Sequence, residues 1–193
     1  MKMTENELNL VAVTFDGLGG KKVKDCDGIY WLFHSGSFLL EVEPFLRKTN
    51  DGFTLGIDVS TSNPELSQII NRISGKRSNK RQQIKWRQWH QTIRSTNDLE
   101  ATYRELLQNA LSETDAVDFK HLVARLADEL PSEKSLSQLS HLAALAYLGK
   151  ARSLSEYREG LEAGRRYGFV PMINVAFLDR AIEEAEKRES QLS

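Results

Sequence analysis

The residues whose types suit chemistry are few in this sequence: one glycine-rich stretch, one cysteine, four histidines and scattered carboxylates. The stretch DGLGGKK, residues 16–22, has the composition of a phosphate-binding loop. Such a loop needs Ser or Thr after its Gly-Lys pair and a helix behind it, so that backbone N–H groups face the phosphate. Lys22 occupies the Ser/Thr position and VKDCDG follows it, so we expect a turn that binds no phosphate.

The cysteine and the histidines offer few candidates for a catalytic nucleophile or for the base that would activate it. Cys26 lies between two acids, which disfavour the reactive thiolate. The sequence contains no H-E-x-x-H, G-x-S-x-G or C-x-x-C motif. His141 lies near the apolar face of a predicted helix, beside Leu139 and Leu142, where a buried and hydrogen-bonded histidine is more common than a catalytic base. We therefore predict no catalytic residue and no enzymatic activity.

The carboxylates Asp16, Glu43 and Asp58 fall near the ends of predicted strands. If these ends met, the three side chains could serve acid–base chemistry or bind a metal ion. Strand ends also carry acids simply because they are exposed to water. A single cysteine allows no intramolecular disulfide, and no Cys/His spacing is typical of a zinc site. The sequence thus predicts neither a metal site nor a cofactor.

The most unusual segment is GKRSNKRQQIKWRQWHQTIR, residues 75–94. Residues 66–97 contain eight Lys and Arg side chains and no acid. Trp86, Trp89 and Ile93 have the spacing of one helical face, which would make them core residues. The alternation that ends at Trp86 also permits a short strand.

Three interpretations of this basic segment stay open. It could be a solvated helix, or one neutralised within the protein, because residues 98–133 carry nine acids against three bases. It could dock a partner protein. It could also hold RNA or single-stranded DNA through residues 76–94, with cations on phosphates and aromatic rings on bases.

Strand-like runs fill the first 60 residues, and they contain or flank most of the carboxylates and the glycine-rich stretch considered above. Residues 8–15 are rich in valine, and residues 29–34 and 37–43 flank a Ser-Gly turn as the arms of a hairpin would. Residues 52–60 follow a second turn, Asn-Asp-Gly. Sequential strands pair most readily as neighbours, so we expect an antiparallel sheet of about four strands within residues 1–62.

Both faces of the strand at residues 29–34 are apolar, because Tyr30 and Leu32 alternate with Trp31 and Phe33. Helices of the same chain can cover one of these faces. The other face needs a second cover, supplied either by the chain's own loops and helices or by a partner protein. Tyr30 and Trp31 are therefore candidate partner-binding residues.

From residue 63 onwards the hydrophobic period becomes helical. Asn63-Pro64-Glu65 has the composition of a helix start. Apolar spacing then predicts helices over residues 63–74, 95–110, 115–130, 135–148, 153–164 and 174–188. The predicted fold class is α+β: an N-terminal antiparallel sheet at residues 1–62, followed by a bundle of five to six helices at residues 63–193, in one compact domain.

The composition predicts a cytoplasmic protein. The 26 basic and 27 acidic side chains give a net charge of -1, so no global attraction to nucleic acid or to an acidic membrane is expected. Glu5 and Glu7 stand where a signal peptide needs positive charge. No apolar run approaches the roughly 18 residues of a membrane span.

Residues 141–182 join an apolar helix, a glycine turn, a second helix, a connection and a final helix. The connection runs from Ala163-Gly164-Arg165 through Phe169-Val170-Pro171 to Ile173. This order resembles a family of small, poorly characterised bacterial proteins. They look like proteins often encoded beside secreted antibacterial toxins, which implies a cytoplasmic immunity role. The shared residues are structural, with Gly164 and Gly168 in turns and Phe169 and Ile173 in packing, and no catalytic residue is transferred.

These observations favour a non-catalytic cytoplasmic protein that binds another protein, specifically an immunity protein that neutralises a cognate secreted toxin. The alternative is a module that binds RNA or single-stranded DNA through residues 76–94. Acidic helices would suit a basic, nuclease-like toxin and the basic segment an acidic one, and the sequence leaves both open. The candidate partner-binding residues are Lys80, Arg81, Lys85, Arg87, Trp31 and Tyr30.

Overall fold

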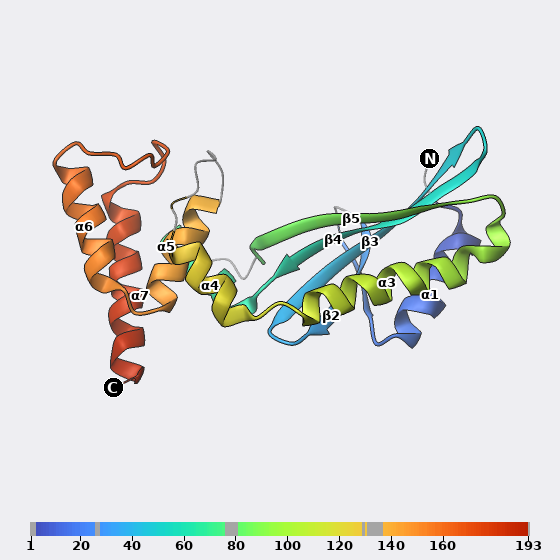
Figure 1. Ribbon diagram of the computed structural model, residues 1–193, viewed down its shortest axis with the longest axis horizontal. Coiled ribbons are helices and arrows are strands. Elements are labelled where there is room, and N and C mark those ends of the chain that lie inside the picture. Colours follow the sequence, from blue (N-terminus) through green and yellow to red (C-terminus); the bar gives the residue numbers. More distant parts are fainter. Residues whose placement is uncertain (1–2, 26–27, 76–80, 129, 131–136, 193) are drawn as a thin grey trace. The chain divides into compact units, whose positions relative to one another are not determined.

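Figure 1 shows a computed structural model of the chain, which describes residues 3–25, 28–75, 81–128, 130 and 137–192. The chain forms two compact units. Unit 1 comprises residues Met1–Ser62 and Lys85–Val117, and unit 2 comprises Asn63–Ile84 and Asp118–Ser193. This division differs from the expected single domain with a helical region at 63–193, because a fifth strand and a long helix return to the sheet.

Unit 1 contains the antiparallel sheet and two helices, which confirms the α+β class. The sheet has five strands in the order β1-β2-β3-β4-β5, so sequence neighbours are also spatial neighbours. The elements of this unit are α1 (Glu5–Gly17), β1 (Lys21–Lys24), β2 (Ile29–Ser35), β3 (Phe38–Thr49), β4 (Gly52–Ser62), β5 (Gln83–Ile93, whose first two residues belong to unit 2) and α3 (Leu99–Asp115). The predicted hairpin of β2 and β3 is confirmed, with Ser35 opposite Phe38 at its turn.

The valine-rich run at residues 8–15, expected to be a strand, lies inside helix α1. A capping box that begins outside the run starts this helix. The Thr4 backbone N–H donates to Glu7 Oε2 over 2.6 Å, and the Glu7 N–H donates to Thr4 Oγ1 over 3.4 Å. Val11 and Phe15, four residues apart, then both point into the core. Capping and helical spacing thus outweigh the strand preference of valine.

The basic segment is also not the helix that the spacing of its tryptophans suggested, because its residues 83–93 form strand β5. This strand lies beside β4, where two glycines permit a close approach. A Cβ atom at Gly56 would lie 2.4 Å from the Trp89 carbonyl oxygen, and one at Gly52 would lie 2.4 Å from the Ile93 carbonyl oxygen. The two contacts run in opposite chain directions, as antiparallel strands require.

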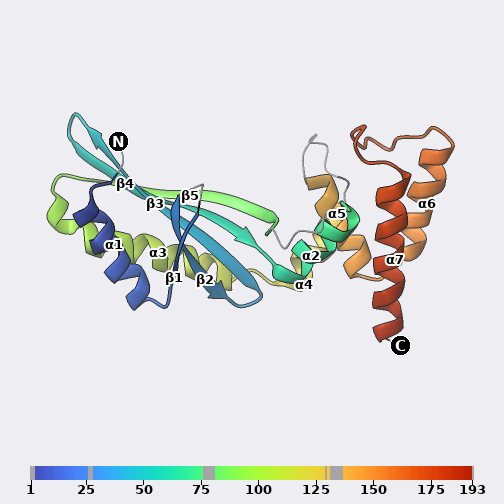
Figure 2. The same ribbon diagram turned by 180° about the vertical axis from the view of Figure 1, so that it is seen from behind.

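Helices α1 and α3 lie on the same side of the sheet in both views (Figures 1 and 2). Phe15 of α1 makes edge-to-face contacts with Trp31 and Phe33 of β2 at ring-centroid distances of 5.2 and 5.9 Å. The Trp31 indole N–H donates to Asp16 Oδ1 over 2.9 Å. Tyr103 of α3 closes this core, and its hydroxyl donates to the Phe45 carbonyl over 2.7 Å.

Unit 2 is helical. It contains α2 (Pro64–Ile73), α4 (Phe119–Asp128), α5 (Ser137–Tyr147), α6 (Ala151–Glu162) and α7 (Val175–Leu192). Asn63 caps α2 as predicted, since its side chain accepts from the Leu66 N–H over 2.8 Å. The buried core includes Leu66, Ile70, Leu142, Leu154, Leu178 and Ala181. Among the described residues, none of the helices is both long and apolar enough to cross a bilayer.

Candidate functional site

The sheet of unit 1 has one face that α1 and α3 do not cover, which we call the open face. Side chains alternate between the faces of a strand, and directly opposite residues on neighbouring strands share a face. Trp31 pairs with Val42 and then with Val59 on the covered face, so Leu32, Glu41 and Ser60 lie opposite one another on the open face. The open face includes Tyr30, Leu32, Leu39, Glu41, Glu43, Phe45, Asp58 and Ser60.

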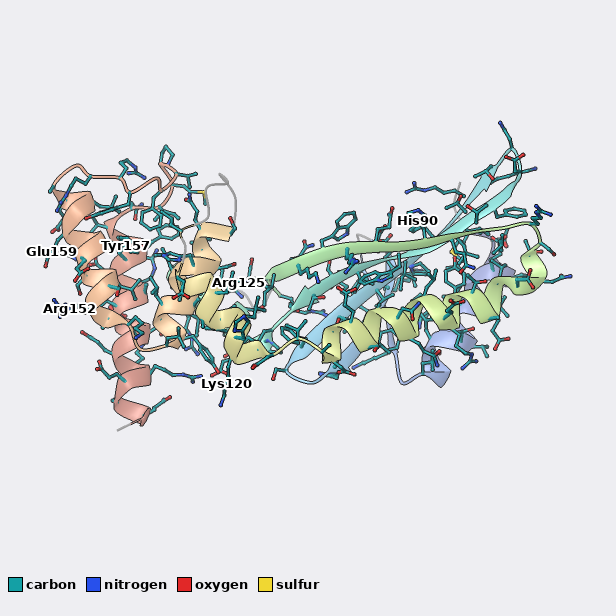
Figure 3. All side chains as sticks on the ribbon, viewed as in Figure 1. His90, Lys120, Arg125, Arg152, Tyr157 and Glu159 are labelled. Atoms are coloured by element: carbon teal, nitrogen blue, oxygen red, sulfur yellow. The ribbon has the colours of Figure 1, made fainter. Side chains whose placement is uncertain are left out.

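Strand β5 follows the same alternation. Lys85 and Arg87 both reach Glu113 of α3, which lies on the covered side. Gln88 instead donates to Asp58 Oδ1 over 2.6 Å, on the open face. Trp86 and His90, two residues before and after Gln88, therefore also lie on the open face. Figure 3 shows His90 on β5, away from α3.

Three carboxylates form the centre of the open face, which we call the acidic centre. Glu43 is directly opposite Asp58 across the β3–β4 pair, and Glu41 precedes Glu43 by two residues on the same face. Burial, then the charge of Asp58 and then that of Glu41 raise the pKa of Glu43 above its usual range. Like charges opposite each other destabilise a sheet, so this arrangement is costly to the isolated fold. Carboxylates gathered on one face can attract a basic ligand.

Aromatic and aliphatic side chains accompany the acidic centre. Tyr30, Leu32, Leu39 and Phe45 are half-buried, whereas Trp86 is 58% exposed. Within the described residues of unit 1, no helix lies over them. Tyrosine and tryptophan are enriched at the centres of protein interfaces, because they contribute large apolar areas together with a polar group. The open face therefore has the composition of a protein-binding surface.

Of the four basic candidate residues, Arg81, Lys85 and Arg87 lie in the described part of the chain, and Lys85 and Arg87 pair with an acid. Lys80 lies outside the described residues, and Arg81 is half-buried in unit 2. Lys85 Nζ lies 2.9 Å from Glu113 Oε1, and Arg87 pairs with the same carboxylate oxygen. A hydrogen bond from Lys85 lowers the pKa of Glu113; burial opposes the shift, while the bond from Arg87 and both positive charges support it. Lys85 and Arg87 thus share a single carboxylate within unit 1, which compensates one of their two positive charges.

The two aromatic candidates have opposite environments. Trp31 is completely buried on the covered face, so its assignment to a partner-binding surface is wrong. The error arises because the sequence shows that β2 is apolar on both faces but not which face the helices cover. Tyr30 lies on the open face, where its hydroxyl donates to Asp25 Oδ2 over 3.0 Å. It remains a candidate contact residue.

The three carboxylates considered for catalysis or metal binding do not converge. Asp16 accepts from Trp31 at the end of α1, whereas Glu43 and Asp58 lie on the open face. Across the described part of the chain, no group of three or more His, Cys, Asp and Glu side chains could hold a metal ion. The glycine-rich stretch leads into strand β1 where a phosphate loop would need a helix. Cys26 lies outside the described residues.

His141 is the buried and hydrogen-bonded residue that its position predicted. Its side chain is 1% exposed, with Nδ1 2.8 Å from the Leu126 carbonyl and Nε2 3.3 Å from the Tyr157 hydroxyl. Burial raises the pKa of Tyr157, and the nearby Tyr167 and Glu156 add to the shift. Tyr157 lies on α6 (Figure 3). Both His141 nitrogens therefore have protein partners, as in a structural histidine.

Unit 2 contains a surface cavity of about 250 Å³ lined by α2, α5 and α7. Its charged side chains pair with one another: Arg72 with Glu184 at 2.7 Å, and Arg188 with Glu65 at 2.6 Å. Burial alone would raise the pKa of Glu184, but hydrogen bonds from Arg72 and Lys187 outweigh it and lower the pKa. These ion pairs join α2 to α7.

Sequence reasoning did not assign Glu41 or Gln88 to a binding face, and it considered Trp86 only as a core residue or as a ring that stacks on nucleic-acid bases. A signal for part of the open face was present, because Glu41, Glu43 and Phe45 alternate with Leu40, Val42 and Pro44 at the period of a strand. The contribution of β5 was hidden, since its tryptophans also fit a helical face.

A family model described as a family of unknown function (DUF6990) matches residues 8–186 of the chain. The match spans both units. No curated protein and no solved structure matches the chain. The family description names no activity, so the immunity role implied by residues 141–182 stays a prediction.

Proposed function

The chain belongs to the DUF6990 family of unknown function, and we propose that it is a non-catalytic protein that binds another protein through the open face of unit 1. The observation that carries this proposal is the acidic centre, set among aromatic side chains on a sheet face that the described helices of unit 1 do not cover. Opposed carboxylates destabilise a sheet, and the exposed Trp86 adds apolar area to the same face, so both features favour a binding role.

The chemistry of the open face defines the partner. Glu41, Glu43 and Asp58 complement a basic surface, and this complementarity acts mainly on the rate of association and on specificity. Trp86 and Tyr30 supply the apolar area that affinity requires. We therefore propose a partner with a basic, partly apolar surface.

The specific form of this proposal is a cytoplasmic immunity protein that neutralises a cognate toxin. The resemblance of residues 141–182 to proteins encoded beside secreted toxins motivates it. Toxins that cleave nucleic acid need a basic active-site surface, because their substrate carries one negative charge per phosphate. The acidic centre would occupy such a surface and exclude the substrate.

The nucleic-acid alternative has weaker support. Lys85 and Arg87 share Glu113, and Trp86 lies on the same face as the acidic centre. A phosphate backbone that approached Trp86 would therefore meet Glu43 and Asp58. An aromatic side chain beside carboxylates is a poor platform for single-stranded nucleic acid, which needs a cationic groove.

The test uses the product of the neighbouring gene as the binding partner, with growth rescue and titration calorimetry as readouts. Glu43→Lys combined with Asp58→Lys reverses the charge of the acidic centre. We expect rescue to be lost and the dissociation constant to rise by about 100-fold or more, as for removal of a central charged contact. Glu183→Lys, an exposed site on α7, is the matched control and should leave both readouts unchanged.

Oligonucleotides provide the opposing arm. Mixed-sequence RNA and single-stranded DNA, tested by fluorescence anisotropy at low salt, should not bind the unmodified protein. Binding that disappears in Lys85→Ala/Arg87→Ala would contradict the proposal and support the nucleic-acid alternative. An equal loss of rescue in Glu183→Lys and in the open-face variant would also contradict it.

A further inference from the structure

Among the strands that the structure describes, β5 forms one outer edge of the sheet of unit 1. The sheet ends in β1 on one side and in β5 on the other. β1 is a four-residue strand with the sequence Lys-Lys-Val-Lys, and short lysine-rich strands are a common protection against edge-to-edge pairing. β5 extends over 11 residues and contains two tryptophans, so its unpaired backbone groups offer a long template for another strand.

The contacts with β4 show which residues of β5 present their backbone to this edge. The carbonyl oxygens of Trp89 and Ile93 lie against Gly56 and Gly52 of β4. In an antiparallel strand, the N–H and C=O of one residue point to the same side, and successive residues alternate. Trp86, Gln88 and His90 therefore direct their N–H and C=O groups away from β4.

We propose that a second copy of this chain pairs with β5 in an antiparallel manner, with the two-fold axis at Gln88. Residues whose numbers sum to 176 then lie opposite each other over residues 85–91: Lys85 with Gln91, Trp86 with His90, Arg87 with Trp89, and Gln88 with its own copy. No like-charged lysine or arginine side chains are opposed, although the strand carries no acid.

Cation–π and aromatic contacts favour a second copy over an unrelated extended segment. Arg87 already lies 5.2 Å from the Trp89 ring centroid within its own strand. Pairing places the partner's Trp89 opposite Arg87 on the covered face, so the same contact recurs across the axis. On the open face, the 58% exposed Trp86 gains the partner's His90 as its direct neighbour.

Because opposite residues share a face, the two open faces would lie on one side of a continuous ten-stranded sheet. The dimer would thus present two acidic centres in the same direction. This inference goes beyond the proposed function and does not depend on it, because it concerns the edge of the sheet and a copy of the same chain.

Cysteine cross-linking tests the register directly. In a Cys26→Ser background, Gln88→Cys places two thiols on directly opposed residues, whose Cα separation of about 5.5 Å suits a disulfide. We expect a disulfide-linked dimer under mild oxidation. His90→Cys is the matched control, because four residues of offset separate it from its own copy by about 13 Å along the strand. Equal cross-linking at both positions would overturn the register.

Sedimentation of the full chain tests the pairing itself. Gln88→Pro removes the edge-facing N–H and should weaken the dimer by about tenfold or more, because two symmetry-related hydrogen bonds are lost. Gln88→Ala keeps this N–H while removing the side-chain bond to Asp58, and it should remain dimeric. A chain that stays monomeric at its highest soluble concentration, with no Gln88→Cys cross-link, overturns the proposal. If Gln88→Pro loses the dimer but binds the partner as well as Gln88→Ala does, the edge pairing and the open-face binding are separate properties.

Discussion

Several side-chain hydrogen bonds hold the connection of unit 2, whereas the open face of unit 1 brings like charges together. In unit 2, Arg166 donates to the carbonyl oxygens of Phe169, Val170 and Ile173 at 3.3, 2.6 and 2.9 Å. The buried Gln138 donates to the Gly168 carbonyl and accepts from the Val170 N–H. Unit 1 instead holds Glu43 opposite Asp58 and exposes Trp86.

We propose from this difference that unit 2 serves stability and that the open face of unit 1 serves binding. Carboxylates that oppose each other reduce stability, and such an arrangement persists where the charges serve binding. The connection of unit 2, with its turns at Gly164 and Gly168 and its buried Phe169 and Ile173, has the structural role that its sequence predicted. We therefore expect substitutions in unit 2 to act through stability, and substitutions on the open face to act through binding.

The largest expected effect is on the free energy of unfolding, and it distinguishes the covered face of the sheet from the open face. Trp31→Ala removes a fully buried ring, its contact with Phe15 and its bond to Asp16, and should lower the free energy of unfolding by about 4 kcal/mol. Trp86→Ala on the open face should cost about 0.5 kcal/mol or less. Urea denaturation followed by circular dichroism measures both. Similar losses for the two tryptophans would contradict the assignment of the open face.

The next effect concerns unit 2. Arg166→Ala removes the donor that holds three carbonyl groups of the connection, and should cost about 2 kcal/mol, as for hydrogen bonds from a charged group. Arg165→Ala is the matched control, because this exposed neighbour only approaches the Tyr167 ring, with 5.9 Å between its guanidinium and the ring centroid. Its cost should stay near 0.5 kcal/mol. Thermal unfolding and partner titration should show that Arg166→Ala lowers stability but leaves binding unchanged. Weakened partner binding in the folded variant would contradict the proposed separation of roles between the two units.

Helical periodicity made unit 2 the more predictable part of the chain. Five of its expected helices occur, and the differences are at their ends, with α6 beginning at Ala151 in place of residue 153. Unit 1 was harder because two of its segments carry misleading local signals. The valine run at residues 8–15 has strand propensity, yet the Thr4–Glu7 capping box makes it helical.

The candidate site depends on pairings that are distant in sequence. Trp86, Trp89 and Ile93 fit a helical face as well as a strand, and the strand depends on a close approach to β4 that Gly52 and Gly56 permit. The burial of Trp31 likewise depends on which side of β2 the helix α1 packs. Single-residue patterns predict that both faces of β2 are apolar, but the choice of the covered face is a tertiary property.

A smaller expected loss of stability concerns the ion pairs between Glu113 and the basic segment. Glu113→Gln removes the carboxylate shared by Lys85 and Arg87, and should cost about 0.5 kcal/mol, since these side chains are largely exposed. A hydrogen bond from Lys85 lowers the folded-state pKa of Glu113, so this contribution is present above the unfolded-state pKa and is lost as pH falls through the folded-state pKa. Urea denaturation across the acidic range measures it.

The same variant tests whether the ion pairs with Glu113 prevent the basic segment from binding nucleic acid. With Lys85 and Arg87 released, Glu113→Gln should gain weak oligonucleotide binding that falls steeply with salt. Glu105→Gln, an exposed site on the same helix, changes the net charge equally and should gain none. Equal gains in both variants would show that net charge, and not the shared carboxylate, controls this property.

The smallest expected effect is a gain in stability, opposite in sign to the losses above, and it concerns Glu43 of the acidic centre. Burial, then Asp58 and Glu41, raise the folded-state pKa of Glu43, so its contribution to stability is full below the unfolded-state pKa and is lost as pH rises through the folded-state pKa. Glu43→Gln should therefore stabilise the protein by a few tenths of a kcal/mol at neutral pH, which is the scale of one opposed pair. Near pH 3, where the carboxyl group is protonated, the gain should vanish.

Glu43→Gln also sharpens the comparison, because the same change should weaken partner binding while it stabilises the fold. Glu105→Gln is again the control, and it should alter neither stability nor binding at any pH. A gain in stability together with a loss of affinity would mean that the open face keeps its charge for binding at a cost to folding. A gain in stability with unchanged affinity would assign the acidic centre to no binding role, and the partner would then have to contact another part of unit 1.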